Sequence, residues 1–88
     1  MPRISAFYGI VILLHWGARE HPLAHFHARY GEYEASIDIA TGGLLVGQLP
    51  RRALSLVQEW TELHRGELQE MWRRAQAHEE LGTIEPLL

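Results

Sequence analysis

Apolar and polar residues alternate along residues 25–30 and again along 33–39, and Gly31 and Glu32 separate the two runs. Alternation with period two on both sides of a Gly-X step is typical of a β-hairpin with a two-residue turn. Such a turn fixes the register of the two strands, so each residue has one defined partner. The pattern therefore predicts a hairpin with one apolar face and one polar face.

The predicted register opposes six pairs of side chains, three on each face of the hairpin. The apolar pairs are Tyr30 with Tyr33, Ala28 with Ala35 and Phe26 with Ile37, and the polar pairs are Arg29 with Glu34, His27 with Ser36 and His25 with Asp38. Opposed side chains have Cβ atoms about 4.5–5.5 Å apart, and each polar pair is chemically compatible. A shift of one residue would place a guanidinium and two imidazoles in the core, so the pattern favours this register.

The segment 4–16 is predicted to form one long strand or two short ones. Gly9 interrupts it, and a glycine inside a strand often marks a bulge or bend. The continuous apolar run that follows indicates either a central strand covered on both faces or a face used for association.

A second turn is expected at the Thr-Gly-Gly step that follows the hairpin. Beyond it, Leu44 and Val46 are expected to continue the apolar face, opposite Ile39 and Ile37. This last strand is expected to end near Gly47. The sheet would then be an antiparallel meander of three or four strands.

Residues 50–78 have the composition of a helix, and Pro50 suits its first turn, where the missing N–H is harmless. Apolar and weakly polar residues recur there at spacings of three and four, which is typical of an amphipathic helix. They are Leu54, Val57, Thr61, His64, Leu68, Met71 and Ala75, with Trp60 and Trp72 widening the stripe. Gly66 is unfavourable in a helix interior, so one long helix and two short helices are both compatible with the sequence.

These elements predict a single α+β domain over residues 1–88. Its expected architecture is a small antiparallel meander of three or four strands packed against the C-terminal amphipathic helix or helices. A three-stranded sheet is marginal alone, and a covering helix supplies the burial that it lacks. The tail after residue 78 carries Ile84, Leu87 and Leu88, which need an apolar surface to contact.

The composition is that of a globular protein, and it narrows the classes of function. Hydrophobic residues make up 47% of the 88 residues and charged residues 22%, and the absence of cysteine excludes disulfides and thiol catalysis. A formal charge of -3 argues against bulk electrostatic binding to DNA but leaves room for a local basic site. The longest aliphatic run is far shorter than a membrane helix, and the N-terminus shows no pattern of a cleaved signal. We therefore expect a cytoplasmic protein without membrane contact.

Six histidines are unusual in so short a chain, and two of them lie on one face of the predicted hairpin. His25 and His27, two residues apart on a strand, can chelate zinc or another divalent metal, with Asp38 or His21 as a third ligand. Pairs of histidines at this spacing occur often by chance. We therefore expect no cofactor, with a metal site as the alternative.

The same face can carry acid–base chemistry without a metal. Arg29 can neutralise a phosphate, and His25 or His27 can transfer a proton. Glu34 or Asp38 can act as a partner or second base. This set of residues would suit a ribonuclease that uses the RNA 2′-hydroxyl as its nucleophile. In the alternative interpretation, the same residues form cross-strand ion pairs on a solvated face.

Arg51 and Arg52 stand at the expected start of the helix, where the helix dipole favours acids over cations. They are therefore candidates for contact with a phosphate or a partner protein, together with Tyr30 and Tyr33 at the end of the hairpin. A solvated first turn is the alternative interpretation of the two arginines.

Several motifs occur together along nearly the whole chain. They are Ile4-Ser5-x-Phe7-Tyr8-Gly9-Ile10, His25-Phe26-His27-x-x-Tyr30-Gly31-Glu32-Tyr33-Glu34-Ala35, Ile37-Asp38-Ile39, Leu49-Pro50-Arg51-Arg52-Ala53-Leu54, Glu59-Trp60-x-x-Leu63-His64-Arg65 and Ile84-Glu85-Pro86-Leu87. With these motifs the chain resembles the small prokaryotic family known as domain of unknown function 4160. The resemblance implies no established activity. It does imply a partner, because members are often encoded beside a second small protein and a toxin–antitoxin-like pairing has been suggested.

The first hypothesis for function is therefore a binding module. The protein would be one component of a two-protein, toxin–antitoxin-like unit that acts through an exposed sheet face or edge and the apolar tail. Its partner would be a small protein encoded by a neighbouring gene, or a second copy of the chain in a homo-oligomer. The alternatives are a metal-independent ribonuclease-like enzyme, with RNA as its partner, and a His-x-His metal-binding domain.

Overall fold

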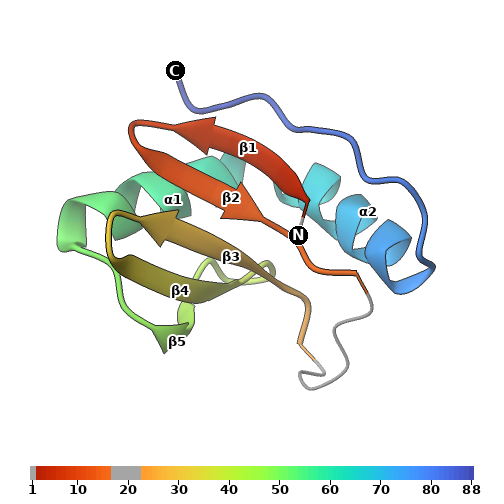
Figure 1. Cartoon of the computed structure of the whole chain (residues 1–88), viewed down its shortest axis with the longest axis horizontal. Helices are drawn as coiled ribbons and strands as arrows, with labels where there is room; N and C mark the ends of the chain where they lie inside the picture. Colours follow the sequence, from red (N-terminus) through yellow and green to blue (C-terminus); the bar gives the residue numbers. More distant parts are fainter. Residues whose placement is uncertain (1, 17–22) are drawn as a thin grey trace.

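The structure is a computed structural model that describes residues 2–16 and 23–88. Within these residues, five strands precede two helices (Figure 1). The strands are β1 (Arg3–Phe7), β2 (Ile10–Leu13), β3 (His25–Tyr30), β4 (Tyr33–Asp38) and β5 (Leu44–Gly47), and the helices are α1 (Arg51–Leu63) and α2 (Arg65–Gln76). His21, the alternative third metal ligand, lies outside the described residues, so its part in the metal hypothesis stays a prediction from sequence.

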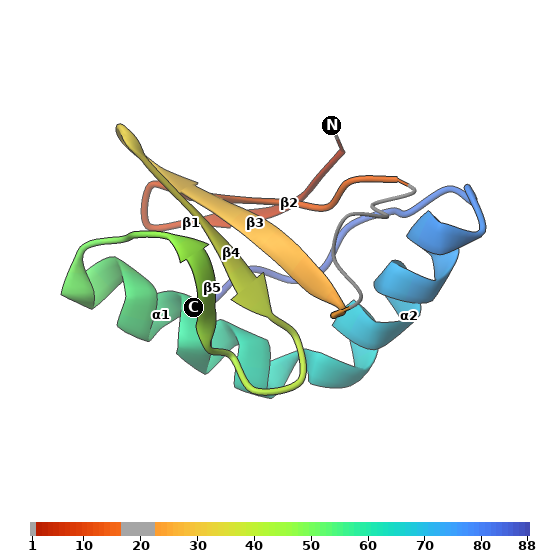
Figure 2. The ribbon, with the colours of Figure 1, turned by 90° about the horizontal axis from the view of Figure 1, so that it is seen from below.

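The strands form one antiparallel meander in the order β1-β2-β3-β4-β5, and both helices lie on the same face of it (Figure 2). The predicted α+β class is confirmed, but the described residues hold five strands where three or four were expected. The difference arises because segment 4–16 forms two strands, joined by a tight turn at Tyr8 and Gly9. Their φ angles of 51° and 80° are both positive, as a type I′ hairpin turn requires.

The hairpin of β3 and β4 has the predicted register in all six pairs. Gly31, with a φ of 57°, supplies the positive φ that glycine tolerates best at the first position of the turn. The apolar pairs farther from the turn are buried in the core. Tyr30 and Tyr33, at the end of the hairpin, are 38% and 43% exposed.

The last strand differs from the prediction in its register and in the face that Val46 occupies. Val46 pairs with Ser36 and Leu44 with Ile37, because an irregularity in the ladder shifts the register between Ser36 and Ile37. Val46 therefore lies on the polar face, and Val46 and Leu44 are 54% and 42% exposed. The expectation that both would be buried in the core was wrong: the bulge moves Val46 off the core face, and Leu44 keeps a core-face partner, Ile37, but is exposed. The predicted end of this strand at Gly47 is confirmed.

Two helices cover the sheet, and the break between them lies at His64 rather than at Gly66. His64 has φ -120° and ψ 21°, which is outside the helical region and ends α1. The predicted stripe is buried at Val57, Thr61, Leu68, Met71 and Ala75. Trp60 is fully buried, and its ring centroid lies 5.4 Å from that of Phe7 and 5.7 Å from that of Phe26. The core therefore lies between the helices and one face of the sheet.

The C-terminal tail packs onto the chain's own core and passes along β1 (Figure 1). The Ile84 amide donates a hydrogen bond to the Ile4 carbonyl oxygen at 2.8 Å, and Trp60 Nε1 donates to the Glu85 carbonyl oxygen at 2.8 Å. Leu87 is buried as well, whereas Leu88 is fully exposed. The surface that the tail needs is thus internal, so most of its apolar area is not available to a partner.

Candidate functional site

Three histidine rings lie in contact on the polar face of the sheet. His27 is central, with its ring centroid 4.2 Å from that of His15 and 5.3 Å from that of His25. His25 and His27 come from β3, and His15 follows β2, two residues after Leu13, the cross-strand partner of His27. We call these three residues the histidine cluster. The sequence analysis missed His15, although its period-two spacing from Leu13 places it on the face of His27.

His25 is buried, with 4% of its surface exposed. Its Nδ1 donates a hydrogen bond to the Leu23 carbonyl oxygen at 2.9 Å, and its ring centroid lies 5.2 Å from that of Trp72 on α2. Asp38, the cross-strand partner of His25, accepts a hydrogen bond at Oδ1 from the Ala40 amide at 2.9 Å. The interpretation of this face as fully solvated was wrong at His25, because α2 supplies a tryptophan that covers it.

At the other end of the face, Arg29 and Glu34 are exposed and form the predicted ion pair. Arg29 Nε donates to Glu34 Oε1 at 2.9 Å. Glu34 Oε2 lies 3.8 Å from His27 Nδ1, and the Ser36 hydroxyl lies 3.4 Å from the same nitrogen. The register thus brings the four polar side chains of this stretch together, with the guanidinium already neutralised by a carboxylate.

Burial sets the protonation of the cluster. Desolvation lowers the pKa of His27 to about 4, the positive charges of His15 and His25 act in the same direction, and Glu34 opposes them. Burial also lowers the pKa of His15. Both rings are therefore neutral near pH 7. A neutral imidazole can accept a proton or bind a metal, but it cannot serve as the acid of an acid–base pair.

This face offers a metal ion few ligands. The described residues contain no group of three or more His, Cys, Asp or Glu side chains placed to hold one ion together. In the predicted set of His25, His27 and Asp38, Nδ1 of His25 is held by the Leu23 carbonyl, so Nε2 is the nitrogen that a metal would use. The zinc alternative stays a prediction.

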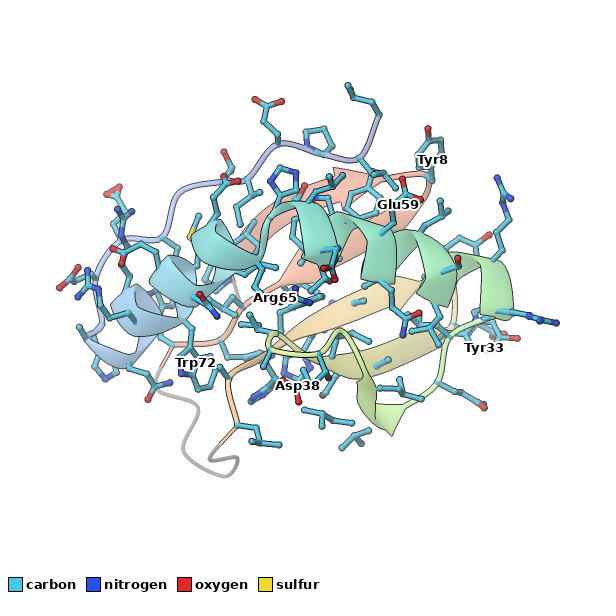
Figure 3. All side chains as sticks on the ribbon, turned by 180° about the vertical axis from the view of Figure 1, so that it is seen from behind. Tyr8, Tyr33, Asp38, Glu59, Arg65 and Trp72 are labelled. Carbon is cyan, nitrogen blue, oxygen red and sulfur yellow. The ribbon has the colours of Figure 1, made fainter. Side chains whose placement is uncertain are left out.

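The second group of predicted contact residues lies at the opposite end of the molecule from Trp72. In Figure 3, Tyr8 and Tyr33 both lie toward the end at which α1 begins, on opposite sides of that helix. Tyr8 (58% exposed) belongs to the turn between β1 and β2, and the sequence analysis missed it as a contact residue. A pocket of about 250 Å³ joins this tyrosine to Tyr30 and Arg52. We call the group of Tyr8, Tyr30, Tyr33, Arg51 and Arg52 the tyrosine–arginine end.

The two arginines of this end differ from the arginines farther along the helices. Within the described residues, the side chains of Arg51 and Arg52 make no hydrogen bond or ion pair, and the first turn of α1 contains no acid. By contrast, Arg73 and Arg74 both bind Glu70, with nitrogen–oxygen distances of 2.9 and 3.0 Å. Their hydrogen bonds lower the pKa of the Glu70 carboxyl to about 2. Two guanidinium groups without partners among the described residues thus lie at the same end as the exposed tyrosines.

Fold and surface together define a small α+β domain in which a five-stranded meander, counted over the described residues, is backed by two helices. Residues 9–73 match the family described as Domain of unknown function (DUF4160), and the chain belongs to this family. No curated protein and no solved structure shows a match to the chain. In the described part of the chain, neither helix combines the length and hydropathy that crossing a bilayer requires.

Proposed function

We propose that this protein is one component of a two-protein, toxin–antitoxin-like module in the cytoplasm and acts by binding a small protein encoded by a neighbouring gene. The binding surface is the edge of the sheet at β5. One observation carries the proposal: β5 is an outer strand with an uncharged sequence and exposed aliphatic side chains.

The two outer strands of the sheet differ in whether another segment covers their free edge. β1 is covered by the tail, whose Ile84 amide binds the Ile4 carbonyl. β5 pairs with β4 on one side, and no described strand pairs with its other side. An open edge offers unpaired backbone N–H and C=O groups to a strand from another chain.

The side chains of β5 do not protect this edge. Proteins commonly block an outer strand with charges, proline or a covering segment. Residues 41–49 contain no charged residue, and Leu44 and Val46 expose aliphatic surface. A partner strand could therefore gain both backbone hydrogen bonds and apolar contacts here.

The test is to measure binding to the protein encoded by the neighbouring gene, by size-exclusion chromatography with light scattering and by calorimetry. Val46→Lys places a charge on the exposed edge and should weaken binding at least about tenfold, or about 1.4 kcal/mol. Leu63→Lys is the matched control, because Leu63 on α1 is 65% exposed and distant in sequence from β5.

A stable wild-type monomer that ignores the neighbouring protein contradicts the proposal, as does equal weakening by both lysine variants. Light scattering on the protein alone also tests the homo-oligomer, since a second copy could pair through the same edge. A dimer abolished by Val46→Lys would identify the partner as a second copy of the chain rather than as the neighbouring protein.

A second candidate function is RNA cleavage at the polar face. It is favoured by His27, whose low pKa keeps a base available at neutral pH beside Glu34 and Ser36. His27 would accept the proton of an RNA 2′-hydroxyl. Cleavage is measured for the wild type, His27→Ala and Arg29→Ala, with and without a chelator. Equal activity in all three proteins contradicts this function.

A further inference from the structure

The pocket at the tyrosine–arginine end combines an apolar base with aromatic and cationic groups. Its lining joins the buried side chains of Ile10 and Ala53 to the partly exposed rings of Tyr8 and Tyr30, and Arg52 adds a guanidinium. At about 250 Å³ it is smaller than the roughly 300–1,000 Å³ typical of pockets for drug-sized ligands. It therefore suits one flat ring with an attached anionic group.

The two tyrosines that line the pocket meet at the turn between β1 and β2, since Tyr8 belongs to this turn and Tyr30 lies at the end of β3. Tyr8 adopts a φ of 51°, a conformation in which Asn or Gly is preferred, and its ring is 58% exposed. A β-carbon at Gly9 would lie 3.5 Å from Cε1 of Tyr30, so the Tyr30 ring rests close against this turn. An unfavourable backbone conformation that serves no burial points to a use of the ring at the surface.

The surface next to the pocket also carries arginine side chains. A second depression of about 410 Å³, lined by Arg51, Arg52, Ser55 and Leu56, shares Arg52 and Leu56 with the pocket. The first acidic residue of α1 is Glu59, two turns after its start. Two guanidinium groups without partners among the described residues therefore follow one another along a continuous surface, as an extended anionic ligand requires.

We propose that the tyrosine–arginine end binds a short stretch of single-stranded nucleic acid. One base stacks on the rings of Tyr8 and Tyr30, and consecutive phosphates bind Arg52 and Arg51. Aromatic faces stack on any base, and guanidinium groups bind phosphate oxygens in a bidentate manner, so the site has little sequence preference. Because the whole chain is acidic, binding depends on this local site. The proposal uses none of the β5 residues and does not depend on the proposed function.

The test measures fluorescence anisotropy with labelled oligo-rU and oligo-dT of about eight nucleotides, a length within the site sizes of single-strand binders. Wild type should bind with a slope of log K against log salt of about -1.4, as expected for two phosphate contacts on a single strand. The double variant Arg51→Ala/Arg52→Ala should lose at least about tenfold in affinity and most of the salt slope. The ratio of the two wild-type affinities tells whether RNA or DNA is the natural ligand.

Matched controls distinguish binding at this site from a general effect of positive charge on the surface. Arg73→Ala/Arg74→Ala removes the same charge from α2 and should leave affinity within about twofold of wild type. Tyr8→Asn keeps a residue suited to the turn, removes the ring and should weaken binding about tenfold, in line with the loss of one stacking contact. An abasic strand of the same length loses its stacking on both rings, so it should bind wild type at least as weakly as the natural strand binds Tyr8→Asn.

Three results would overturn the proposal. They are the absence of saturable binding by wild type, equal losses in the two double-arginine variants, and equal affinity for the abasic strand. Val46→Lys should leave oligonucleotide binding unchanged, so a failure of the β5 interface and a failure of this site give different results.

Discussion

His27 lies between the core and solvent, with 20% of its side chain exposed and His15 and His25 on either side. Its neighbours decide its chemistry, because desolvation and two imidazoles favour the neutral ring. Alternation in the sequence was enough to put His27 beside Ser36 and Glu34. The burial of the histidine cluster was not predictable from the sequence, because Trp72, which packs against His25, belongs to a helix far along the chain.

The pH dependence of stability follows from this environment. The pKa of His27 is lowered from the ordinary histidine value of 6.5, which applies in the unfolded chain, to about 4 in the fold. Between these two pH values the unfolded chain therefore binds more protons than the folded chain. The contribution of His27 to the free energy of unfolding is therefore fully present above this window and is lost as the pH falls through it. We predict a Tm that decreases on acidification from pH 7.5 to pH 5, at about 4–8 °C per kcal/mol lost.

Variants test whether His27 causes this decrease in Tm on acidification. His27→Gln should show a clearly smaller decrease in Tm over the same range, because the substituted group does not titrate. The control His78→Gln changes an exposed histidine and should behave like wild type. Equal pH dependence in wild type and His27→Gln would show that His27 titrates normally in the fold.

Tyr8 gives a second prediction for a single residue. Because its positive φ is unfavourable for tyrosine and its ring is largely exposed, Tyr8→Asn should raise the free energy of unfolding by about 1 kcal/mol. Chemical denaturation measures this change. A loss of stability would mean that the Tyr8 ring contributes to folding, and it would remove the argument that the ring serves a surface function.

Among the described elements, β5 has a glycine packed directly against the neighbouring strand. Gly47 has a φ of 81°, and a β-carbon there would collide with the Glu34 carbonyl oxygen. The hairpin of β3 and β4 was predictable because its turn fixes the register. The position of β5 was not, because a bulge shifts its register and moves Val46 to the polar face, and the alternating sequence pattern does not reveal a bulge.

We predict that Gly47→Ala releases β5 from β4 and lowers the free energy of unfolding by at least about 1–3 kcal/mol, since it combines backbone strain with a collision. Amide exchange should rise first in β5. Gly66→Ala is the control, because a β-carbon there meets no atom within 4 Å and alanine should stabilise α2 by up to about 1 kcal/mol. Similar effects of the two substitutions would contradict this account of β5.

In the whole molecule, the tail completes a thin core and closes the β1 edge. Ile84 is 4% exposed, so Ile84→Ala should cost about 2–5 kcal/mol of stability in denaturant unfolding. Leu88→Ala, at a fully exposed residue, should change stability by less than about 0.5 kcal/mol. If the two variants were equally stable, the tail would not belong to the core and the β1 edge would also be open to partners.

The two proposed binding surfaces, the β5 edge and the tyrosine–arginine end, lie at different places on the sheet. The first has unpaired strand backbone and aliphatic side chains, and the second has aromatic rings and arginines. A protein partner and a nucleic acid could therefore bind without competing for the same residues.

The most direct test of the central claim is hydrogen–deuterium exchange of the protein alone and mixed with the protein encoded by the neighbouring gene. If the partner adds a strand at β5, amides of residues 44–47 should exchange at least about tenfold more slowly in the mixture, while those of β1 stay unchanged. A complex that forms without slower exchange in β5, or no complex at all, would contradict the account.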